Sequence, residues 1–516
     1  MTLIDFFDKG VQRNPQRPCL ICGDESVSYG EVQRRSYLIA GALGRAGVRP
    51  GAHAAVLAHN GTRPFECVLG ALRAGCTWVP VNARSTVREI GEVLRRTRAD
   101  VLFYESAFAE AVTSILDSRA GTIRTICIDG DGIGGQPNLE ALCTGISPDR
   151  RDLRLDGDAL ATLATSGGTT GSPKGVMTSN RTWAFRIAEV MVRLAHPDPV
   201  HLVAAPMTHG AGAGALELMA IGATHVILRN FDAGAVIDAI GRHKVSHMFL
   251  PPTALYRVLS HPDLRKGDYR SLAYLICGGA PMSPDRLREA VSVFGTAMHT
   301  GYGGTEFGGG LTWMPGTALR DAIARGDERR LLSCGRPSPV ARIDILGDDG
   351  SVLPPEQPGE IVIRSYTLAS GYYEDEEETR QAFRPEGFHT GDIGYFDREG
   401  WLYICDRRKD MIISGGFNIY PSEVEKVLMS HPAVQDCAVV GVPDQEWGES
   451  VKAVLELKAN RTVEPAELEA LCRASLAGFK VPRSYEIWPE IPRSPVGKVL
   501  KRVIRERYWQ AHERKV

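Results

Sequence analysis

The sequence predicts an α/β protein with more than one domain, and three features of the chain indicate this. Helix-like and strand-like patterns alternate from residue 30 onward. After about residue 330 the pattern changes to short strands and turns. The chain also has 516 residues, whereas single hydrophobic cores stop growing at about 250–300 residues.

The alternation is clearest near the start of the chain. Residues 29–48 and 65–75 have the apolar spacing of amphipathic helices. Residues 53–59 (HAAVLAH) and 77–81 (TWVPV) are short apolar runs typical of strands. The same rhythm returns over residues 224–260. We therefore expect crossover units that form largely parallel sheets with helical cover, arranged as two α/β subdomains.

The change of pattern after residue 330 predicts a smaller, β-rich subdomain. Residues 341–365 have the features of hairpins, with corners at Asp348–Gly350 and Gln357–Gly359. We expect a small barrel-like subdomain over about residues 330–405. It would complete an N-terminal domain covering residues 1–405.

The last part of the chain predicts a compact α+β domain. Its expected helices and strands follow the order helix, strand, strand, helix, over residues 421–432, 436–444, 450–458 and 464–476. The charged segment 406–410 precedes them and is the expected hinge. Residues 411–516 would then form a mobile C-terminal lid domain.

Composition favours a small-molecule partner. The formal net charge is −2, so no global field favours nucleic acid or an anionic membrane. The first residues, MTLIDFFDKG, carry acids where a secretory signal needs bases, and no run of about 20 uncharged apolar residues occurs. The odd number of cysteines, 11, argues for reduced thiols. We expect a cytoplasmic protein without a transmembrane segment, and a monomer or homodimer.

The segment Ser166–Gly175, SGGTTGSPKG, has the composition of an anion-binding loop. Glycine-rich backbone can present several N–H groups to phosphate oxygens, with hydroxyls and an ammonium group completing the shell. A P-loop NTPase fits poorly, because Lys174 is followed by glycine and a β-like Val176–Met177 instead of Ser or Thr and a helix. On its composition alone, a flexible surface linker is the alternative.

The loop resembles the phosphate loop of the adenylate-forming superfamily, which holds acyl-CoA synthetases, luciferases and peptide-synthetase adenylation domains. Six further motifs follow in the family's order, from the middle to the end of the chain. They are PMTHGAG (206–212), CGGAP (277–281), YGGTE (302–306), HTGDIG (389–394), DRRKDMIISGGFNIYPSEVE (406–425) and PRSPVGK (492–498). Asp406 is a departure, since the family usually has glycine there.

The resemblance implies an acyl-CoA synthetase, an ATP-dependent and AMP-forming acid–thiol ligase. A carboxylate attacks the α-phosphate of ATP to give acyl-AMP and pyrophosphate, and CoA then takes the acyl group. The implied ligands are ATP, Mg²⁺, CoA and a small carboxylic acid. A carboxylate is already an oxygen nucleophile, which explains why no Ser-His-Asp or Cys-His arrangement is needed.

The resemblance also implies a set of nucleotide-binding residues. Glu306 would hold Mg²⁺, Thr305 would contact the α-phosphate and Lys498 would bridge the carboxylate and the α-phosphate. The full set is Ser166, Gly167, Gly168, Thr169, Thr170, Gly171, Lys174, Gly279, Ala280, Tyr302, Gly303, Thr305, Glu306, Asp392, Arg407 and Lys498. Within it, Tyr302 would stack on adenine, while Asp392 and Arg407 would bind the ribose. Taken alone, Tyr302 is compatible with core packing, Glu306, Asp392 and Arg407 with solvated ion pairs, and Lys498 with a solvated position in a basic tail.

The remaining implied roles concern the second half-reaction and the acid. Lys409 would be the hinge residue, and Ser414, Gly415, Gly416 and Phe417 would lie beside the pantetheine of CoA. The acyl pocket would be lined by Met207, His209, Gly214, Cys277, Gly278 and Gly301, with His209 as a gate or a structural histidine. These segments lack Lys and Arg, so a fatty, cyclic or aromatic monocarboxylic acid is favoured.

Other functions stay open at this point. The protein could be a stand-alone acyl-AMP ligase that loads a carrier protein, or a specialist in one half-reaction. A luciferase-like oxidative use is a further alternative. A more remote one is a nucleotide-binding regulator without catalysis.

Overall fold

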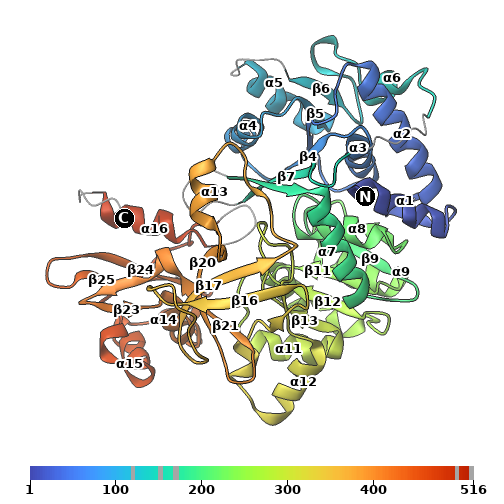
Figure 1. Ribbon diagram of the computed structural model, residues 1–516. Helices are drawn as coiled ribbons and strands as arrows, with labels where there is room; N and C mark the ends of the chain where they lie inside the picture. The colour runs from blue at the N-terminus through green and yellow to red at the C-terminus, as the bar shows by residue number, and fades with distance from the viewer. Residues whose placement is uncertain (118–122, 149–154, 167–173, 494–498, 511–516) are drawn as a thin grey trace. The chain divides into compact units, whose positions relative to one another are not determined.

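The computed structural model describes residues 1–117, 123–148, 155–166, 174–493 and 499–510 (Figure 1). The chain forms two compact units. The first contains Met1–Arg342 and Arg364–Phe383, and the second contains Ile343–Ile363 and Arg384–Val516. The predicted α/β class, with a large N-terminal part and a smaller C-terminal part, is confirmed.

One sheet of the first unit has seven strands in the order β18-β8-β7-β4-β3-β5-β6. Its strands are β3 (His53–Leu57), β4 (Thr77–Val81), β5 (Val101–Tyr104), β6 (Arg124–Cys127), β7 (Leu160–Ser166), β8 (Lys174–Ser179) and β18 (Gly371–Tyr372). The strands from β7 to β6 are parallel, whereas β8 and β18 are antiparallel additions. All residues of β3, β4 and β5 are buried, as expected where helices cover both faces of a parallel sheet.

Helices precede or separate these strands. Among them, α2 (Tyr29–Arg45) and α3 (Thr62–Arg73) overlap the predicted helical ranges 29–48 and 65–75, and α4 (Val87–Arg96) and α5 (Ala109–Asp117) continue the alternation. The start of α4 follows from a capping box: Thr86 Oγ1 accepts from Glu89 N at 3.3 Å, and the Glu89 carboxylate accepts from Thr86 N at 2.7 Å.

The second sheet of this unit also has seven strands, in the order β13-β12-β11-β9-β10-β1-β2. They are β1 (Pro18–Cys22), β2 (Glu25–Ser28), β9 (Val200–Val203), β10 (Thr224–Ile227), β11 (His247–Leu250), β12 (Tyr274–Cys277) and β13 (Met298–Thr300). Associated helices include α1 (Leu3–Arg13), α7 (Asn180–Arg193), α8 (Gly210–Met219), α9 (Ala233–His243), α10 (Pro252–Leu259), α11 (Pro284–Phe294) and α12 (Gly316–Arg325). Except for the β1–β2 pair, neighbouring strands are parallel, which gives the second α/β subdomain.

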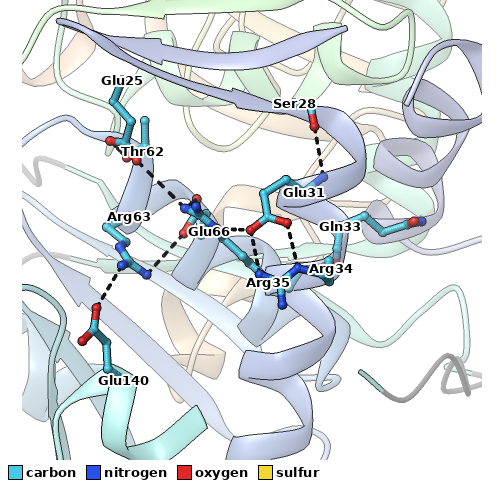
Figure 2. A network of polar contacts seen from close by, with 11 residues as sticks. Glu25, Ser28, Glu31, Gln33, Arg34, Arg35, Thr62, Arg63, Glu66 and Glu140 are labelled. Atoms are coloured by element: carbon cyan, nitrogen blue, oxygen red, sulfur yellow. Dashed lines mark hydrogen bonds and ion pairs between the residues drawn. The ribbon is translucent and has the colours of Figure 1, made fainter. Parts of the chain in front are cut away.

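A network of charged side chains joins α2 to α3, and its centre is Glu66 (Figure 2). The Glu66 side chain is fully buried, and its Oε1 accepts from Arg35 Nη1 at 2.7 Å. Arg35 Nε also donates to Glu31 Oε1 at 2.7 Å, and Arg34 holds the same carboxylate with two hydrogen bonds of 2.7 Å. Hydrogen bonds from Arg34 lower the pKa of Glu31 to about 2. Burial raises the pKa of Glu66, despite the charges of Arg35 and Arg63.

The second unit contains two sheets. One has β16 (Ala341–Leu346), β17 (Gly359–Ser365), β20 (Gly387–Phe396) and β19 (Phe383–Arg384) in that order, with β21 (Leu402–Arg407) paired to β20. The other has the order β23-β22-β25-β24, with β26 paired to β25. Its strands are β22 (Ile412–Ser414), β23 (Phe417–Ile419), β24 (Val434–Asp444), β25 (Gly448–Leu457) and β26 (Ser484–Ile487). The helices α14 (Pro421–Met429), α15 (Pro465–Ser475) and α16 (Lys501–Trp509) complete the unit.

The compact units do not divide at the predicted hinge. Most of the β-rich part of residues 330–405 groups with the C-terminal residues. The segment 406–410 forms the end of β21 and a short 3₁₀ turn at Arg408–Asp410. A mobile lid that begins at residue 411 therefore stays a prediction. None of the described helices combines the length and the apolar character that a membrane crossing requires.

Candidate functional site

The predicted phosphate loop joins two antiparallel strands. Ser166, the last residue of β7, pairs with Lys174, the first residue of β8. Lys174 therefore starts a strand and not a helix, which agrees with the sequence argument against a P-loop NTPase. Gly167, Gly168, Thr169, Thr170 and Gly171 lie outside the described residues, as does Lys498.

Lys174 lies within a small network of side chains. Its Nζ is 2.5 Å from Glu378 Oε2 and 5.0 Å from the centre of the Tyr372 ring. Glu378 belongs to the short helix α13 (Glu376–Ala382), and Tyr372 to the edge strand β18. An ammonium group over an aromatic face is attracted by the ring quadrupole. Lys174 is thus held from two sides.

Tyr372 connects this network to Glu306, the candidate metal ligand. The Tyr372 hydroxyl donates to Glu306 Oε1 at 3.3 Å, and the Glu306 carbonyl accepts from Ala369 N at 2.7 Å. Segments that are far apart in the sequence therefore bring Lys174 and Glu306 to the same tyrosine. Tyr372 and Glu378 were not predicted, because the GYY and EEE sequences around them carry no local mark of a site.

Arg186 of α7 supports the YGGTE segment from inside the protein. Its Nε and Nη2 donate to the Thr367 carbonyl at 3.1 and 2.9 Å, and Nη2 also reaches the Thr305 carbonyl at 3.4 Å. Burial lowers the pKa of Arg186 to about 10, while the charges of Glu217 and Glu306 oppose this shift. Arg186 therefore fixes the backbone from which Thr305 and Glu306 project.

Tyr302 and Gly303 begin the same segment. Tyr302 is 9% exposed, its N donates to Thr312 Oγ1 at 3.0 Å, and its ring packs on Phe307 with centroids 5.1 Å apart. A Cβ at Gly303 would lie 2.5 Å from Gly310 N, so this close backbone approach requires glycine. The predicted stacking of Tyr302 on adenine stays a prediction.

The segments predicted to line the acyl pocket meet around Phe249 of β11. A Cβ at Gly210 would lie 3.2 Å from the Phe249 ring, and a Cβ at Gly278 would lie 3.8 Å from it. A Cβ at Gly278 would also lie 3.5 Å from the Gly301 carbonyl. Met207 and Cys277 are buried, a Cβ at Gly214 would lie 3.7 Å from His201 Nε2, and Gly279 and Ala280 follow β12. Phe249 was missed because a single aromatic residue in a buried strand resembles ordinary core.

Asn60 fixes the first of these segments. Its Oδ1 accepts from Met207 N at 2.9 Å, and its Nδ2 donates to the carbonyls of Ala205 and Leu228, both at 3.0 Å. His209 follows as the residue before α8 and is exposed, with Nδ1 2.9 Å from Thr208 Oγ1. Whether His209 acts as a gate stays a prediction.

The predicted ribose-binding residues belong to the second unit and are neighbours there. Asp392 of β20 pairs in register with Arg407 of β21, and Arg407 Nε lies 3.0 Å from Asp392 Oδ1. Asp406 Oδ2 accepts from Ser422 N at 2.7 Å, at the start of α14. Lys409 is exposed, and its carbonyl accepts from Arg505 Nη1 at 3.0 Å. The carboxylate at position 406 thus ties the first residue of the predicted hinge segment to α14.

The predicted CoA segment, Ser414–Phe417, forms the turn between β22 and β23. Gly415 has a φ of +58°, and a Cβ there would lie 2.4 Å from the Trp447 ring. Both facts require glycine at this position. Gly416 follows it, and the Phe417 ring is half-exposed and stacks on Phe479 at 4.7 Å.

Comparisons with known proteins identify the family. The sequence profile of the AMP-binding enzyme family matches residues 7–373. The chain belongs to this family of AMP-binding enzymes. The profile of the AMP-binding enzyme C-terminal domain matches residues 423–498. The resemblance to the adenylate-forming superfamily and the predicted class, an ATP-dependent, AMP-forming ligase of the acyl-CoA synthetase type, are confirmed.

Several relatives of this AMP-binding enzyme match over nearly its whole length. A feruloyl-CoA synthase of Amycolatopsis sp. is 34% identical over 498 residues, which cover 96% of each chain. A fatty acid–[acyl-carrier-protein] ligase, ScoC of Streptomyces coeruleorubidus, is 32% identical over 521 residues, covering 100% of this chain and 98% of the relative. The amide bond synthetase McbA of Marinactinospora thermotolerans has a similar structure, with a TM-score of 0.87, 28% identity, and coverage of 98% of this chain and 100% of that chain.

Proposed function

We propose that this AMP-binding enzyme converts ATP and a carboxylic acid to acyl-AMP and pyrophosphate, and then transfers the acyl group to CoA with release of AMP. The observation that carries the proposal is the meeting of Lys174 and Glu306 at Tyr372. A phosphate-binding cation and a carboxylate for a metal ion are the groups that an attack on ATP needs close together.

The nucleotide roles follow the family resemblance. Lys174 and the loop before it would bind the β- and γ-phosphates, Thr305 the α-phosphate, and Tyr302, Gly279 and Ala280 the adenine. Asp392 and Arg407 would bind the ribose, and Lys498 would support the charge that develops during attack.

Glu306 is the proposed ligand for Mg²⁺. Among the described residues, no group of three or more His, Cys, Asp or Glu side chains is arranged to hold a metal ion. Mg²⁺ in nucleotide sites is usually bound by one or two carboxylates together with substrate phosphates, so one glutamate fits it. When bound, the ion would offset phosphate charge and help to orient the triphosphate.

The proposed acid is a neutral monocarboxylic acid of the fatty, cyclic or aromatic kind. Phe249, Met207 and Cys277 are apolar, and Gly210 and Gly278 approach the Phe249 ring without a side chain of their own. Such a pocket favours an apolar body and disfavours a second charge. The relatives named for ferulate and for a fatty acid are compatible with this class.

CoA is the proposed acceptor, and a carrier protein is the second candidate. The feruloyl-CoA synthase supports CoA, whereas ScoC is named for an acyl-carrier protein and matches at a similar identity. The same proposal includes a rotation of residues 411–516 about Lys409 between the two half-reactions. It also includes a cytoplasmic location and a monomeric or homodimeric state.

A panel of carboxylic acids tests the proposal. The purified protein with ATP, Mg²⁺ and each acid should exchange pyrophosphate into ATP, and mass spectrometry should detect acyl-AMP and, after addition of CoA, acyl-CoA. The control is Lys498→Ala, which should lose exchange but keep thioester formation from preformed acyl-AMP. Release of ADP and orthophosphate in place of AMP would refute the proposal, and acyl transfer only to a carrier protein would favour the second candidate.

A further inference from the structure

The helix α13 carries three consecutive glutamates with different surroundings. Glu376 is exposed, and Glu377 accepts from Arg380 Nη2 and Gln381 Nε2, each at 2.7 Å. Glu378 instead points to Lys174, with Oε2 2.5 Å from Nζ. Only Glu378 of this run is therefore positioned to affect the phosphate-binding lysine.

The position of Glu378 is fixed by its own helix. Its backbone N donates to Asp375 Oδ1 at 3.2 Å, which caps the first turn. The next residue, Thr379, accepts from Tyr372 N at 2.9 Å and donates to the Asp375 carbonyl at 2.7 Å. The start of α13 is thus tied to β18, the strand whose tyrosine contacts Lys174.

The pair itself is only partly buried. The Lys174 side chain is 20% exposed and that of Glu378 is 38% exposed, so water and ligands can reach both. An ammonium group carries three donors on a flexible stem, and its partners exchange more easily than those of an arginine fork. Lys174 can therefore release the carboxylate when phosphate oxygens arrive.

We propose that Glu378 is the resting counter-ion of Lys174, and that it sets the affinity of the site for ATP and pyrophosphate. The inference rests on the proposed function, in which Lys174 binds the outer phosphates of ATP. Binding exchanges the carboxylate for phosphate oxygens at Nζ and leaves a negative charge beside the polyphosphate. Both effects weaken binding, so Glu378 limits the retention of pyrophosphate after the first half-reaction.

Direct binding measurements test this exchange. By calorimetry with Mg²⁺ present, Glu378→Gln should bind α,β-methylene-ATP and pyrophosphate about three- to fivefold more tightly than the unmodified protein at low salt. The gain should shrink at about 1 M salt, where charges are screened over about 3 Å. The matched control is Glu377→Gln, which removes the neighbouring charge of the same helix and should leave both affinities unchanged.

A double substitution shows whether Glu378 acts through the lysine. In a Lys174→Met background, the gain from Glu378→Gln should be smaller than in the unmodified background, because the competition for Lys174 no longer exists and only the repulsion between the carboxylate and the polyphosphate is relieved. Equal affinities for Glu378→Gln and Glu377→Gln, or an undiminished gain without Lys174, would overturn the inference. Failure of the proposed function would look different, since the unmodified protein would then neither bind the ATP analogue nor form AMP from ATP.

Discussion

Two charged networks in the first unit use similar residues in different ways. The network at Glu66 joins two helices through arginines, and its central carboxylate has no solvent exposure. The network at Lys174 joins β8, α13, β18 and the YGGTE segment through a lysine and a tyrosine, and its ion pair stays partly exposed. A buried arginine binds a carboxylate through a planar guanidinium group with fixed geometry, whereas the flexible ammonium group of an accessible lysine can change its partner. We expect the first network to stabilise the fold and the second to bind a ligand.

Loss of Arg35 should give the largest change in stability. Arg35→Met leaves the buried Glu66 carboxylate with Arg63 Nη1 at 4.0 Å, and the free energy of unfolding should fall by about 3 kcal/mol. Urea unfolding measures this loss, and acyl-AMP formation per folded molecule should not change. A loss below about 1 kcal/mol would contradict a structural role.

The pH dependence of the same variant gives an independent check. Burial already raises the pKa of Glu66, and removal of the Arg35 charge should raise it further. A carboxyl group with a raised pKa in the folded state contributes stability at low pH and loses it as the pH rises through that pKa. The loss in the free energy of unfolding that Arg35→Met causes, relative to the unmodified protein, should therefore be smaller at pH 5 than at pH 8.

Glu306→Gln should reduce activity and leave stability nearly unchanged, the opposite of Arg35→Met. Glutamine keeps a side-chain oxygen that can accept from Tyr372 but removes the charge, so stability should change by less than about 0.5 kcal/mol. Acyl-AMP formation should fall about a hundredfold, which corresponds to about 2.7 kcal/mol in the barrier. The control is Glu328→Gln, an exposed glutamate whose partner is Arg288 at 2.7 Å. A loss of both activity and stability would show that Glu306 is mainly structural.

The sequence predicted one kind of site residue and missed another. Lys174 and Glu306 are recognised because they belong to short motifs, and the alternation of helices and strands predicts the two α/β subdomains. Tyr372, Glu378 and Phe249 belong to no such motif, and each makes its contacts with the candidate site only where distant segments meet. Local patterns record backbone preferences and burial, but they do not record which side chains from separate strands come together.

The same reason explains the division of the chain. The short strands after residue 330 were predicted from turns and hairpin patterns, and β16, β17 and β20 lie there. Their grouping with the C-terminal residues depends on contacts between distant parts of the chain, for which a local pattern gives no evidence. Arg186 and Asn60 are single-residue examples of such distant contacts. The side chain of each donates hydrogen bonds to backbone carbonyls more than a hundred residues away in the sequence.

Tyr372→Phe tests the connection inside the site. It removes the hydrogen bond of 3.3 Å to Glu306 and keeps the ring under Lys174. The Glu306 carboxylate is then held less firmly for the metal ion. The Mg²⁺ concentration at which ATP stabilises the protein half-maximally should therefore rise about fivefold. Thermal unfolding with ATP at increasing Mg²⁺ measures this without turnover. The control is Tyr373→Phe, whose ring packs edge-on to His53 at 5.1 Å. Equal effects of the two changes would remove Tyr372 from the site.

Arg34→Ala should give the smallest change in stability. It tests whether the exposed part of the Glu66 network contributes as much as its buried centre. The Arg34 side chain is 51% exposed, and exposed pairs within one helix contribute about 0.3–0.5 kcal/mol, so the free energy of unfolding should fall by no more than that. Because the pKa of Glu31 is lowered to about 2, this contribution is present above the unfolded pKa and is lost as the pH falls toward 2. The difference between Arg34→Ala and the unmodified protein should thus be present at pH 7 and shrink below pH 4.5. A loss of unfolding free energy equal to that of Arg35→Met would mean that the exposed Arg34 stabilises the fold as much as the contact with the buried Glu66. Burial would then no longer distinguish a structural network from a ligand-binding one.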